Sequence, residues 1–284
     1  MNIQWYPGHM TKTKRLILEN LKIIDVVIEL VDARAPLSSK NPDIDLFAQN
    51  KPKIVLLNKS DLANKDITKK WHAWYEAQGA RVIEVNSITG VGVSKVIEVA
   101  QDLMKGRIEA DLKRGRINRP IRAMVVGIPN VGKSTFINKL VGKSTTKTGD
   151  RPGVTRGKQW VKIRKGFELL DMPGILWPKF EDREVALNLA FIGAIKDDIL
   201  DIVTLSYNLV AHLQKIEPLA ITTRYKIQID EQDTSDEIFE KIARKRGFIV
   251  SGGKIDELRT AQIFIDEFRG GKLGKISIES PKGI

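Results

Sequence analysis

Nine consecutive residues, Gly127 to Thr135, have the composition and spacing of a phosphate-binding loop. They read Gly-Ile-Pro-Asn-Val-Gly-Lys-Ser-Thr and fit the pattern Gly-x-x-x-x-Gly-Lys-Ser/Thr. In such a loop, backbone N–H groups and a helix N-terminus surround the phosphates of a nucleotide. Lys133 would reach the β- and γ-phosphates, and the Ser134 hydroxyl would bind Mg²⁺. The residues expected to contact the nucleotide are Asn130, Val131, Gly132, Lys133, Ser134 and Thr135.

The residues around this loop predict the strand and the helix that hold it. Residues 121–126 favour a buried strand, and residues 135–140 favour a helix. Further strands are predicted at 25–31, 53–57 and 81–85, with a hairpin of strands at 159–163 and 167–170. Helices are predicted between them at 10–22, 68–78 and 94–104. This alternation is typical of an α/β fold with a mainly parallel sheet, whose strand ends carry the chemistry.

A second motif, Asn58-Lys59-Ser60-Asp61, directly follows the strand predicted at 53–57. The Asp61 carboxylate can accept two hydrogen bonds from guanine, from N1–H and from the 2-amino group, whereas adenine offers no such pair. A site that leaves a polar group unpaired rejects the wrong ligand by as much as roughly 10⁴–10⁵. Asn86 and Ser87, after the next strand, would support the base. Together these residues predict guanine specificity.

A third motif, Asp171-x-x-Gly174, follows the last predicted strand. Asp171 would supply a carboxylate linked to Mg²⁺, and the Gly174 N–H would approach the γ-phosphate. A second hydroxyl for Mg²⁺ is expected from the basic loop before the hairpin. Thr155 is the chosen residue because Pro-Gly-Val-Thr resembles the corresponding loop of translation-type GTPases. The alternatives in the same loop are Thr145, Thr146 and Thr148.

The charge of the 284-residue chain is unevenly distributed. Its formal net charge is +12, and residues 143–165 hold eight basic residues against one acid. Residues 105–122 add seven basic residues, and we interpret residues 105–120 as a connector. In residues 205–284 the numbers of basic and acidic residues are nearly equal. This clustering favours a nucleic acid partner. The chain contains no cysteine, which excludes disulfides and thiolate metal sites. No membrane span or secretory signal is predicted, so we expect a cytoplasmic protein.

Strand patterns end near residue 180, and helical patterns replace them. Helices are predicted at 182–195, 197–214, 234–246 and 254–269. The third begins with a capping box of Thr234 and Glu237 and ends at Gly247. The fourth places Ile255, Leu258, Ala261, Ile265 and Phe268 on one face. We therefore predict a nucleotide-binding domain over residues 1–180 and a smaller all-helical domain over 181–284.

The three motifs are those of GTPases, but their order along the chain is changed. Usually the phosphate loop comes first and Asn-Lys-x-Asp comes late, whereas here residues 58–61 precede residues 127–135. The chain therefore resembles a circularly permuted GTPase, a rearrangement that leaves every site residue in place. With Trp5-Tyr6-Pro7-Gly8-His9-Met10, Asp32-Ala33-Arg34 and Ile175-Leu176-Trp177-Pro178, it is similar to the bacterial ribosome biogenesis GTPase A family. The resemblance covers essentially the whole chain.

The resemblance implies functional roles for three further features. Many GTPases place Gln after Asp-x-x-Gly to orient the attacking water, but this chain has Ile175. His9 is the family's candidate for that catalytic role; its alternative is a structural turn histidine. Lys133 is the second catalytic candidate, because it neutralises developing charge. Asn130 would coordinate K⁺ beside the phosphates, where an arginine finger otherwise acts.

The resemblance also implies a function and partners. We expect a GTPase that binds GTP and GDP, requires Mg²⁺ and K⁺, and acts as a monomer. Its helical domain would contact RNA, and its role would lie in late assembly of the large (50S) ribosomal subunit. The expected partner is the precursor of that subunit, including rRNA and ribosomal proteins, and not a membrane. Two alternatives are a GTP-regulated RNA-binding module with negligible turnover and a GTPase acting on another RNA such as tRNA.

Overall fold

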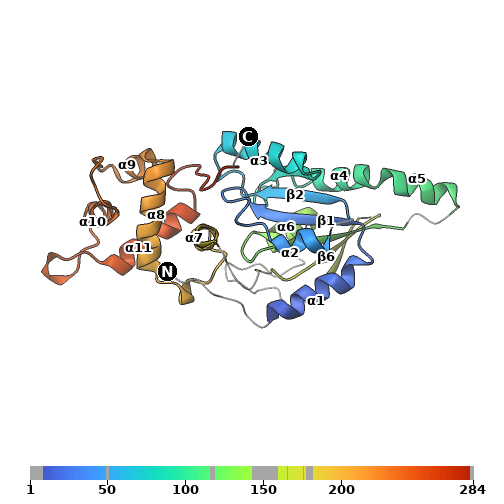
Figure 1. Ribbon diagram of the computed structural model, residues 1–284, viewed down its shortest axis with the longest axis horizontal. Coiled ribbons are helices and arrows are strands. Elements are labelled where there is room, and N and C mark those ends of the chain that lie inside the picture. Colours follow the sequence, from blue (N-terminus) through green and yellow to red (C-terminus); the bar gives the residue numbers. More distant parts are fainter. Residues whose placement is uncertain are drawn as a thin grey trace.

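A six-stranded sheet forms the larger lobe of the molecule (Figure 1). The computed structural model describes residues 9–48, 51–115, 119–142, 159–164, 166–174, 176 and 182–281. The strands are β1 (Val26–Asp32), β2 (Lys53–Asn58), β3 (Arg81–Val85), β4 (Ile121–Gly127), β5 (Gln159–Arg164) and β6 (Phe167–Asp171). Their order is β3-β2-β1-β4-β6-β5, and only β5 pairs antiparallel. The predicted mainly parallel α/β sheet and its hairpin are confirmed.

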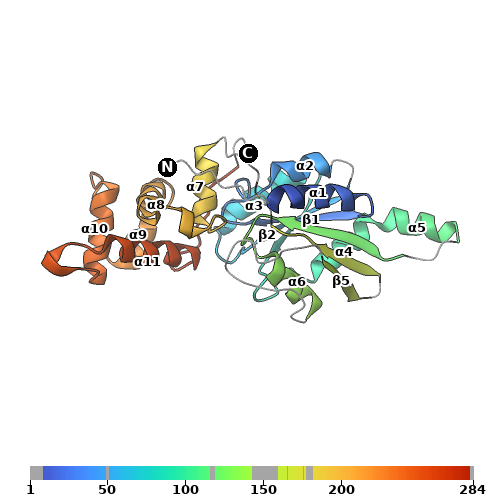
Figure 2. The same ribbon diagram turned by 90° about the horizontal axis from the view of Figure 1, so that it is seen from below.

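Helices cover both faces of this sheet (Figure 2). One face packs against α1 (His9–Leu21), α2 (Pro42–Phe47) and α3 (Lys65–Ala77). The other packs against α4 (Lys95–Leu103) and α6 (Lys133–Val141). Every residue of β1 is buried, because this strand has a neighbour on each side and a helical layer on each face. None of the helices within the described residues is long and apolar enough to span a membrane.

A helical lobe follows the sheet (Figure 1). It contains α7 (Arg183–Phe191), α8 (Ile202–Ile216), α9 (Leu219–Tyr225), α10 (Ser235–Arg246) and α11 (Glu257–Arg269), with short 3₁₀ turns at Asp197–Ile199 and Ser251–Gly253. The predicted capping box is present, because Thr234 and the Glu237 side chain cap α10 reciprocally. The prediction for Leu258 was wrong: this side chain is 55% exposed, and Phe264 is buried instead.

The interpretation of residues 105–120 as a connector was also wrong in part. Residues Lys105–Lys113 form helix α5, which continues from the end of α4 and projects away from the sheet (Figure 1). No α5 residue is buried, so the helix leaves little hydrophobic periodicity in the sequence. Helices α2 and α9 were not predicted, and both are shorter than eight residues.

The last described residues return from the helical lobe to the sheet. The backbone N–H of Ile276 donates to Leu62 O at 3.0 Å, and that of Ile278 donates to Arg34 O at 2.8 Å. One hydrophobic cluster also continues from the α4 and α6 face of the sheet into α7, α8 and α11. The sequence predicted a domain boundary between residues 180 and 181. Residues 177–181 lie outside the described residues, so this boundary stays a prediction.

A buried carboxylate joins three helices of the helical lobe. Glu267 on α11 is 5% exposed and accepts hydrogen bonds from Arg224 at 2.6 and 2.9 Å and from the Tyr225 hydroxyl at 2.8 Å. It also pairs with Arg246 of α10. These donors, Arg224 foremost, outweigh burial and lower the pKa of Glu267 to about 2.

We expect Glu267→Gln to lower the free energy of unfolding at pH 7 by about 1.5–3 kcal/mol, the usual value of hydrogen bonds to a charged group. Because folding lowers this pKa from 4.5 to about 2, the stabilisation is present above the unfolded pKa. It is lost as pH falls from 4.5 towards 2. Urea denaturation across this pH range should show wild type and variant converging in acid. Asp266→Asn, which changes the exposed neighbouring acid, is the matched control; equal losses in both variants would contradict the assignment.

Candidate nucleotide-binding site

The carboxyl ends of the parallel strands bring the three motifs to one edge of the sheet. Asn58 is the last residue of β2, Asn86 directly follows β3, Gly127 ends β4 and Asp171 ends β6. In the register of the sheet, Asn58 lies beside Asp32 of β1. Motifs that are far apart in the sequence therefore meet where ligands bind in α/β sheets of this kind.

The phosphate loop has the backbone that close approach to an anion requires. Gly132, with φ of 101°, precedes α6 in a left-handed conformation, and Asn130 also has positive φ, at 57°. No side chain of the described residues caps the N-terminus of α6. Its first N–H groups and its positive dipole end therefore suit a phosphate. The strand, loop and helix predicted around residues 127–135 are confirmed, with α6 beginning at Lys133.

Asn58 connects the phosphate loop with the loop that follows β3. Its Nδ2 donates to Val131 O in the phosphate loop at 2.7 Å. Its Oδ1 accepts from the Ser87 hydroxyl at 2.7 Å and from the Ser87 N–H at 3.2 Å. A Cβ added at Gly132 would lie 2.4 Å from the same Nδ2, so only glycine leaves room for this contact. Asn58 therefore sets the spacing between the phosphate loop and Ser87.

The other residues of the base-recognition loops have different environments. Lys59 has positive φ, at 59°, and its Nζ lies 3.0 Å from Asp32 Oδ2. The Ser60 hydroxyl donates to Val85 O at 3.1 Å, which ties this loop to β3. Asp61 is exposed. The Asn86 side chain instead folds its own loop, because its Oδ1 accepts from the N–H groups of residues 88 and 89 at 2.9 Å.

Asp171 and Lys133 form the charged part of the phosphate site. Asp171 is fully buried, and neither carboxylate oxygen has a hydrogen-bond partner among the described residues. Burial raises the pKa of Asp171 to about 6, although nearby Lys133 acts in the opposite direction. Burial also lowers the pKa of Lys133, against the effect of Asp171. Two unpartnered buried carboxylate oxygens near Lys133, which is followed in α6 by the partly exposed Ser134, fit a Mg²⁺ ion that also takes phosphate and water ligands.

The remaining predicted site residues are only partly described. Gly174 lies against the phosphate loop, since a Cβ added there would be 2.9 Å from the Pro129 nitrogen. His9 begins α1, but its side chain lies outside the described residues. Thr155 and Ile175 also lie outside them. No cluster of three or more His, Cys, Asp or Glu suited to a metal occurs within the described part of the chain.

Known proteins resemble this chain over nearly its whole length. A family model described as "50S ribosome-binding GTPase" matches residues 122–243. The chain is 47% identical over 282 residues to the ribosome biogenesis GTPase A of Bacillus pumilus, covering 99% of this chain and 100% of that protein. It is 34% identical over 286 residues to that of Thermotoga maritima, covering 99% and 96%. The chain belongs to the ribosome biogenesis GTPase A family.

Solved structures of this GTPase family share the fold. GDP-bound TM YlqF superposes with a TM-score of 0.69 at 29% identity, covering 95% of this chain and 100% of that one. GNP-bound YlqF from T. maritima gives 0.64 at 31% identity, covering 96% and 100%. The predicted circularly permuted GTPase fold is confirmed. The family model begins at residue 122, within β4, so residues 58–61 lie before its match, as the permuted order requires.

The structure also shows site residues of the GTPase whose roles the sequence did not predict. Asp32, at the end of β1, is fully buried and accepts from Arg34 Nε and Nη2, both at 2.9 Å. Burial favours a higher pKa for Asp32, but Arg34 and Lys59 outweigh it and hold the pKa well below its usual range. This buried carboxylate therefore fixes the lysine of the Asn-Lys-x-Asp motif. The sequence feature that could have identified Asp32 is an acidic residue at the end of a strand, followed two residues later by an arginine.

Two contacts join these nucleotide loops to the helical lobe. Arg34 Nη1 donates to the carbonyl oxygen of Arg269, at the end of α11, at 3.0 Å. Asn130 Nδ2 donates to Gly193 O, just beyond α7, at 2.8 Å. The Arg269 side chain in turn donates to Ala190 O at 2.8 Å and packs against Gly193. The phosphate loop and the segment that follows β1 therefore both touch the corner formed by α7 and α11.

We expect Gly132→Ala to weaken guanine nucleotide binding by roughly tenfold or more, equivalent to a loss of at least ~1.4 kcal/mol. The added Cβ would displace the Asn58 amide that holds the phosphate loop. Gly142→Ala is the matched control, because Gly142 also has positive φ, at 73°, but has open space around it. Fluorescent GDP titration of both folded variants would measure the difference, and equal affinities would show that the contact is not required.

Proposed function

We propose that this GTPase hydrolyses GTP to GDP and phosphate in a cycle coupled to a pre-ribosomal particle, and that it promotes late assembly of the large (50S) ribosomal subunit. The observation that carries the proposal is the meeting of Asn58, Lys133 and Asp171 at one sheet edge in a chain of this family. The name shared by its relatives, ribosome biogenesis GTPase A, supports the particle as the partner. The description of the family model supports the 50S subunit.

Each motif residue has a proposed task in hydrolysis. Mg²⁺, when bound, neutralises charge that develops on the phosphates. Ser134 would hold this ion directly, Asp171 would hold it through water, and Thr155 would add a second hydroxyl. The Lys133 side chain is buried at the start of α6, which directs its charge at the phosphates rather than at solvent. The N–H of Gly174 would meet the γ-phosphate. Asp61 would select guanine through its two acceptor oxygens.

Water activation is proposed to depend on the particle. Ile175 carries no hydrogen-bonding group, so the free protein should turn over slowly. His9 would take over the orientation of water, and Asn130, whose amide nitrogen donates to Gly193, would coordinate K⁺. The same Ile175 favours the second candidate function, a GTP-regulated RNA-binding module with negligible turnover. Turnover on the particle separates the two functions.

The basic residues that precede β4 would provide part of the RNA contact. Lys105, Lys113 and Arg114 of the projecting α5 region are exposed. Arg107 and Arg119 differ, because both pair with Asp25, at 2.7 and 2.8 Å. The first group is therefore suited to phosphate contacts, whereas the second stabilises the start of β1. RNA affinity that depends on such contacts falls steeply with salt.

Asp61→Asn should shift the preference from guanine to xanthine nucleotides. The substitution replaces one acceptor oxygen by a donor, which matches the carbonyl that xanthine carries in place of the 2-amino group. We expect GTP affinity to fall by two or more orders of magnitude, in line with the roughly 10⁴–10⁵ discrimination that such sites reach. Competition titrations with GTP, XTP and ATP measure this shift. Equal binding of ATP and GTP by the wild-type protein would contradict the base assignment.

Large-subunit particles should stimulate single-turnover GTP hydrolysis, and more strongly in KCl than in NaCl. His9→Ala should remove most of this stimulation. General acid–base catalysis typically raises a rate by about 10²–10⁴-fold, which sets the size of the loss that we expect. Its GTP affinity should stay near that of wild type, because His9 belongs to no nucleotide-binding motif. His72→Ala, which changes a half-buried histidine of α3 that pairs with Glu76 and belongs to none of the three motifs, is the matched control. Absence of stimulation in wild type would favour the RNA-binding module, and full stimulation of the His9 variant would exclude His9.

A further inference from the structure

The C-terminal end of α7 meets the phosphate loop in a glycine turn. Gly193 lies just beyond the helix with φ of 76°, a left-handed conformation that favours glycine. Its N–H donates to Ala190 O at 3.1 Å, and the Ala194 N–H donates to Leu189 O at 2.9 Å. These are the two hydrogen bonds of a Schellman turn, which ends a helix. The Gly193 carbonyl lies outside the helix and accepts from Asn130 Nδ2 at 2.8 Å.

Arg269, the last residue of α11, holds this turn in place. Its Nη2 donates to Ala190 O at 2.8 Å, and its Nε donates to Phe191 O at 3.1 Å. Both carbonyls belong to the last turn of α7, where a helix leaves carbonyl oxygens to other donors and favours positive charge. A Cβ added at Gly193 would lie 3.2 Å from the same Nε, so the guanidinium packs directly on the glycine.

Asp197 fixes the orientation of the Arg269 guanidinium. Its carboxylate accepts from Nη1 at 2.8 Å and from Nη2 at 2.9 Å. A bidentate pair of this kind sets both the position and the plane of the guanidinium. The Asp197 side chain is 49% exposed, so the pair contributes little to the stability of the fold. Its main effect is to aim Arg269 at the end of α7.

The end of α11 also contacts the segments near the base-recognition motif. The Arg269 carbonyl accepts from Arg34 Nη1 at 3.0 Å. A Cβ added at Gly271 would lie 2.7 Å from the side chain of Leu62, the residue that follows the Asn-Lys-x-Asp motif. The end of α11 is therefore held against the sheet lobe, and Arg269 has a fixed base from which to hold α7.

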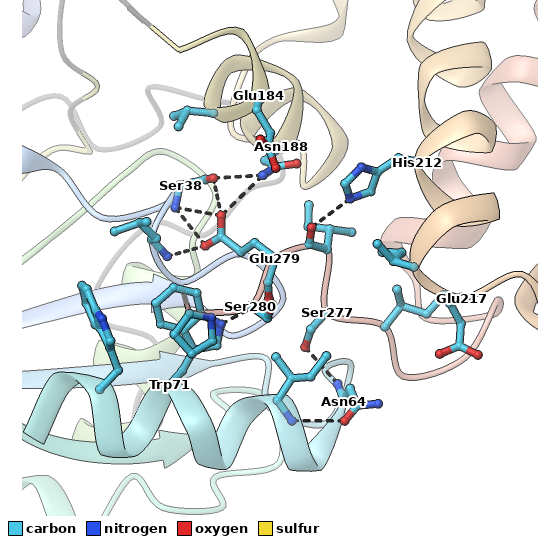
Figure 3. Close-up of a pocket in the computed structure, with 18 of the residues that line it drawn as sticks. Ser38, Asn64, Trp71, Glu184, Asn188, His212, Glu217, Ser277, Glu279 and Ser280 are labelled. Atoms are coloured by element: carbon cyan, nitrogen blue, oxygen red, sulfur yellow. Dashed lines mark hydrogen bonds between the residues drawn. The ribbon is translucent and has the colours of Figure 1, made fainter. Parts of the chain in front are cut away.

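A second, separate network holds the middle of α7 (Figure 3). Asn188 Nδ2 donates to Ser38 Oγ at 3.0 Å and towards Glu279 Oε2 at 3.4 Å. The Glu279 carboxylate also accepts from the Ser38 N–H at 3.0 Å. None of these three bonds involves Arg269, so α7 keeps this attachment to the sheet lobe when Arg269 is replaced. We therefore expect such a replacement to act mainly on the end of α7.

We propose that Arg269 is a positioning residue for the nucleotide, because it holds the Gly193 carbonyl against Asn130 and so keeps the phosphate loop in its binding conformation. Asn130 has φ of 57°, which is uncommon for a residue other than glycine, and its hydrogen bond to Gly193 opposes relaxation of the loop. The helical lobe thus contributes to nucleotide affinity. By linkage, bound nucleotide strengthens the contact of α7 with the phosphate loop to the same extent.

This inference rests on the nucleotide site of the proposed function, but it requires neither hydrolysis nor a ribosomal particle. Its test is a double-mutant cycle on GDP affinity, measured by titration of fluorescent GDP with the full-length protein in KCl and MgCl₂. Arg269→Gln should weaken GDP binding by about threefold to tenfold, the change to which one ordinary hydrogen bond corresponds.

The second variant of the cycle is Asn130→Gly, which accepts the positive φ but removes the amide that reaches Gly193. In this background Arg269→Gln should change GDP affinity by less than about twofold, because the contact through which Arg269 acts is already lost. A residue that only packs the two lobes together would instead give equal losses in both backgrounds.

Two further variants control the cycle. Arg259→Gln is the matched control, because Arg259 is exposed on the same helix and lies over the Phe248 ring instead, 4.8 Å from its centroid. It should leave GDP affinity unchanged. Asp197→Asn leaves Arg269 in place but weakens the pair that aims it, and should lower GDP affinity only when Asn130 is present. This exposed substitution carries the test if Arg269→Gln does not fold.

Unchanged GDP affinity in a folded Arg269→Gln, or an equal loss in both backgrounds, overturns the proposal. So does an equal loss in Arg259→Gln, which would make the effect one of charge alone. Wild-type protein that binds no GDP would contradict the nucleotide site itself. Normal GDP binding without particle-stimulated hydrolysis would contradict only the proposed GTPase cycle, so the two failures can be told apart.

Discussion

The buried carboxylate of Asp32 is the interaction on which the arrangement of this GTPase depends. It lies at the end of the central strand β1, where the backbone reaches the nucleotide edge of the sheet. A buried carboxylate is tolerated only when cationic partners compensate for its lost hydration. Arg34 and Lys59 form ion pairs with Asp32 and provide this compensation. Removal of one member of such a group typically costs about 3–5 kcal/mol, since it leaves the others buried and unpaired. The positions of Arg34 and Lys59 are therefore set by Asp32 more than by their own loops.

This constraint extends in two directions. Towards the nucleotide, Lys59 lies next to Asn58, whose amide holds the phosphate loop and Ser87 at 2.7 Å each. Towards the helical lobe, Arg34 reaches the end of α11, and its own carbonyl accepts from Ile278. A single short segment after β1 thus contacts the base-recognition loop, the helical lobe and the C-terminal segment. Motion of any of these three elements must be accommodated by the others or break a buried hydrogen bond.

The sequence predicted the sheet well because its four inner strands, β2, β1, β4 and β6, are almost entirely buried. Runs such as residues 26–32 are rich in β-branched residues, and the polar motif after each run marks the strand end. The same reasoning failed for helices and side chains that bury little surface. Helix α5 buries no residue and left no periodic signal, and Leu258 was placed on the buried face of α11 because only spacing was available. The motif residues could be found from their types and spacing. The hydrogen bonds by which Asn58 links two loops, and by which Asn86 folds its own loop, could be found only from the structure.

The permuted chain order gives the helical lobe its particular position. In the sheet, β4 and β6 carry the phosphate loop and Asp171, and they are neighbours regardless of where the chain begins. What the permutation changes is the segment that follows Asp-x-x-Gly. Only eight residues separate Gly174 from the first residue of α7, Arg183. The loop that would meet the γ-phosphate is thus covalently joined to the lobe whose Gly193 carbonyl accepts from the phosphate-loop Asn130. One corner of the helical lobe is therefore held by the nucleotide site through the chain and through a hydrogen bond. A displacement of Asn130 on nucleotide exchange would have to move Gly193 with it or break this hydrogen bond.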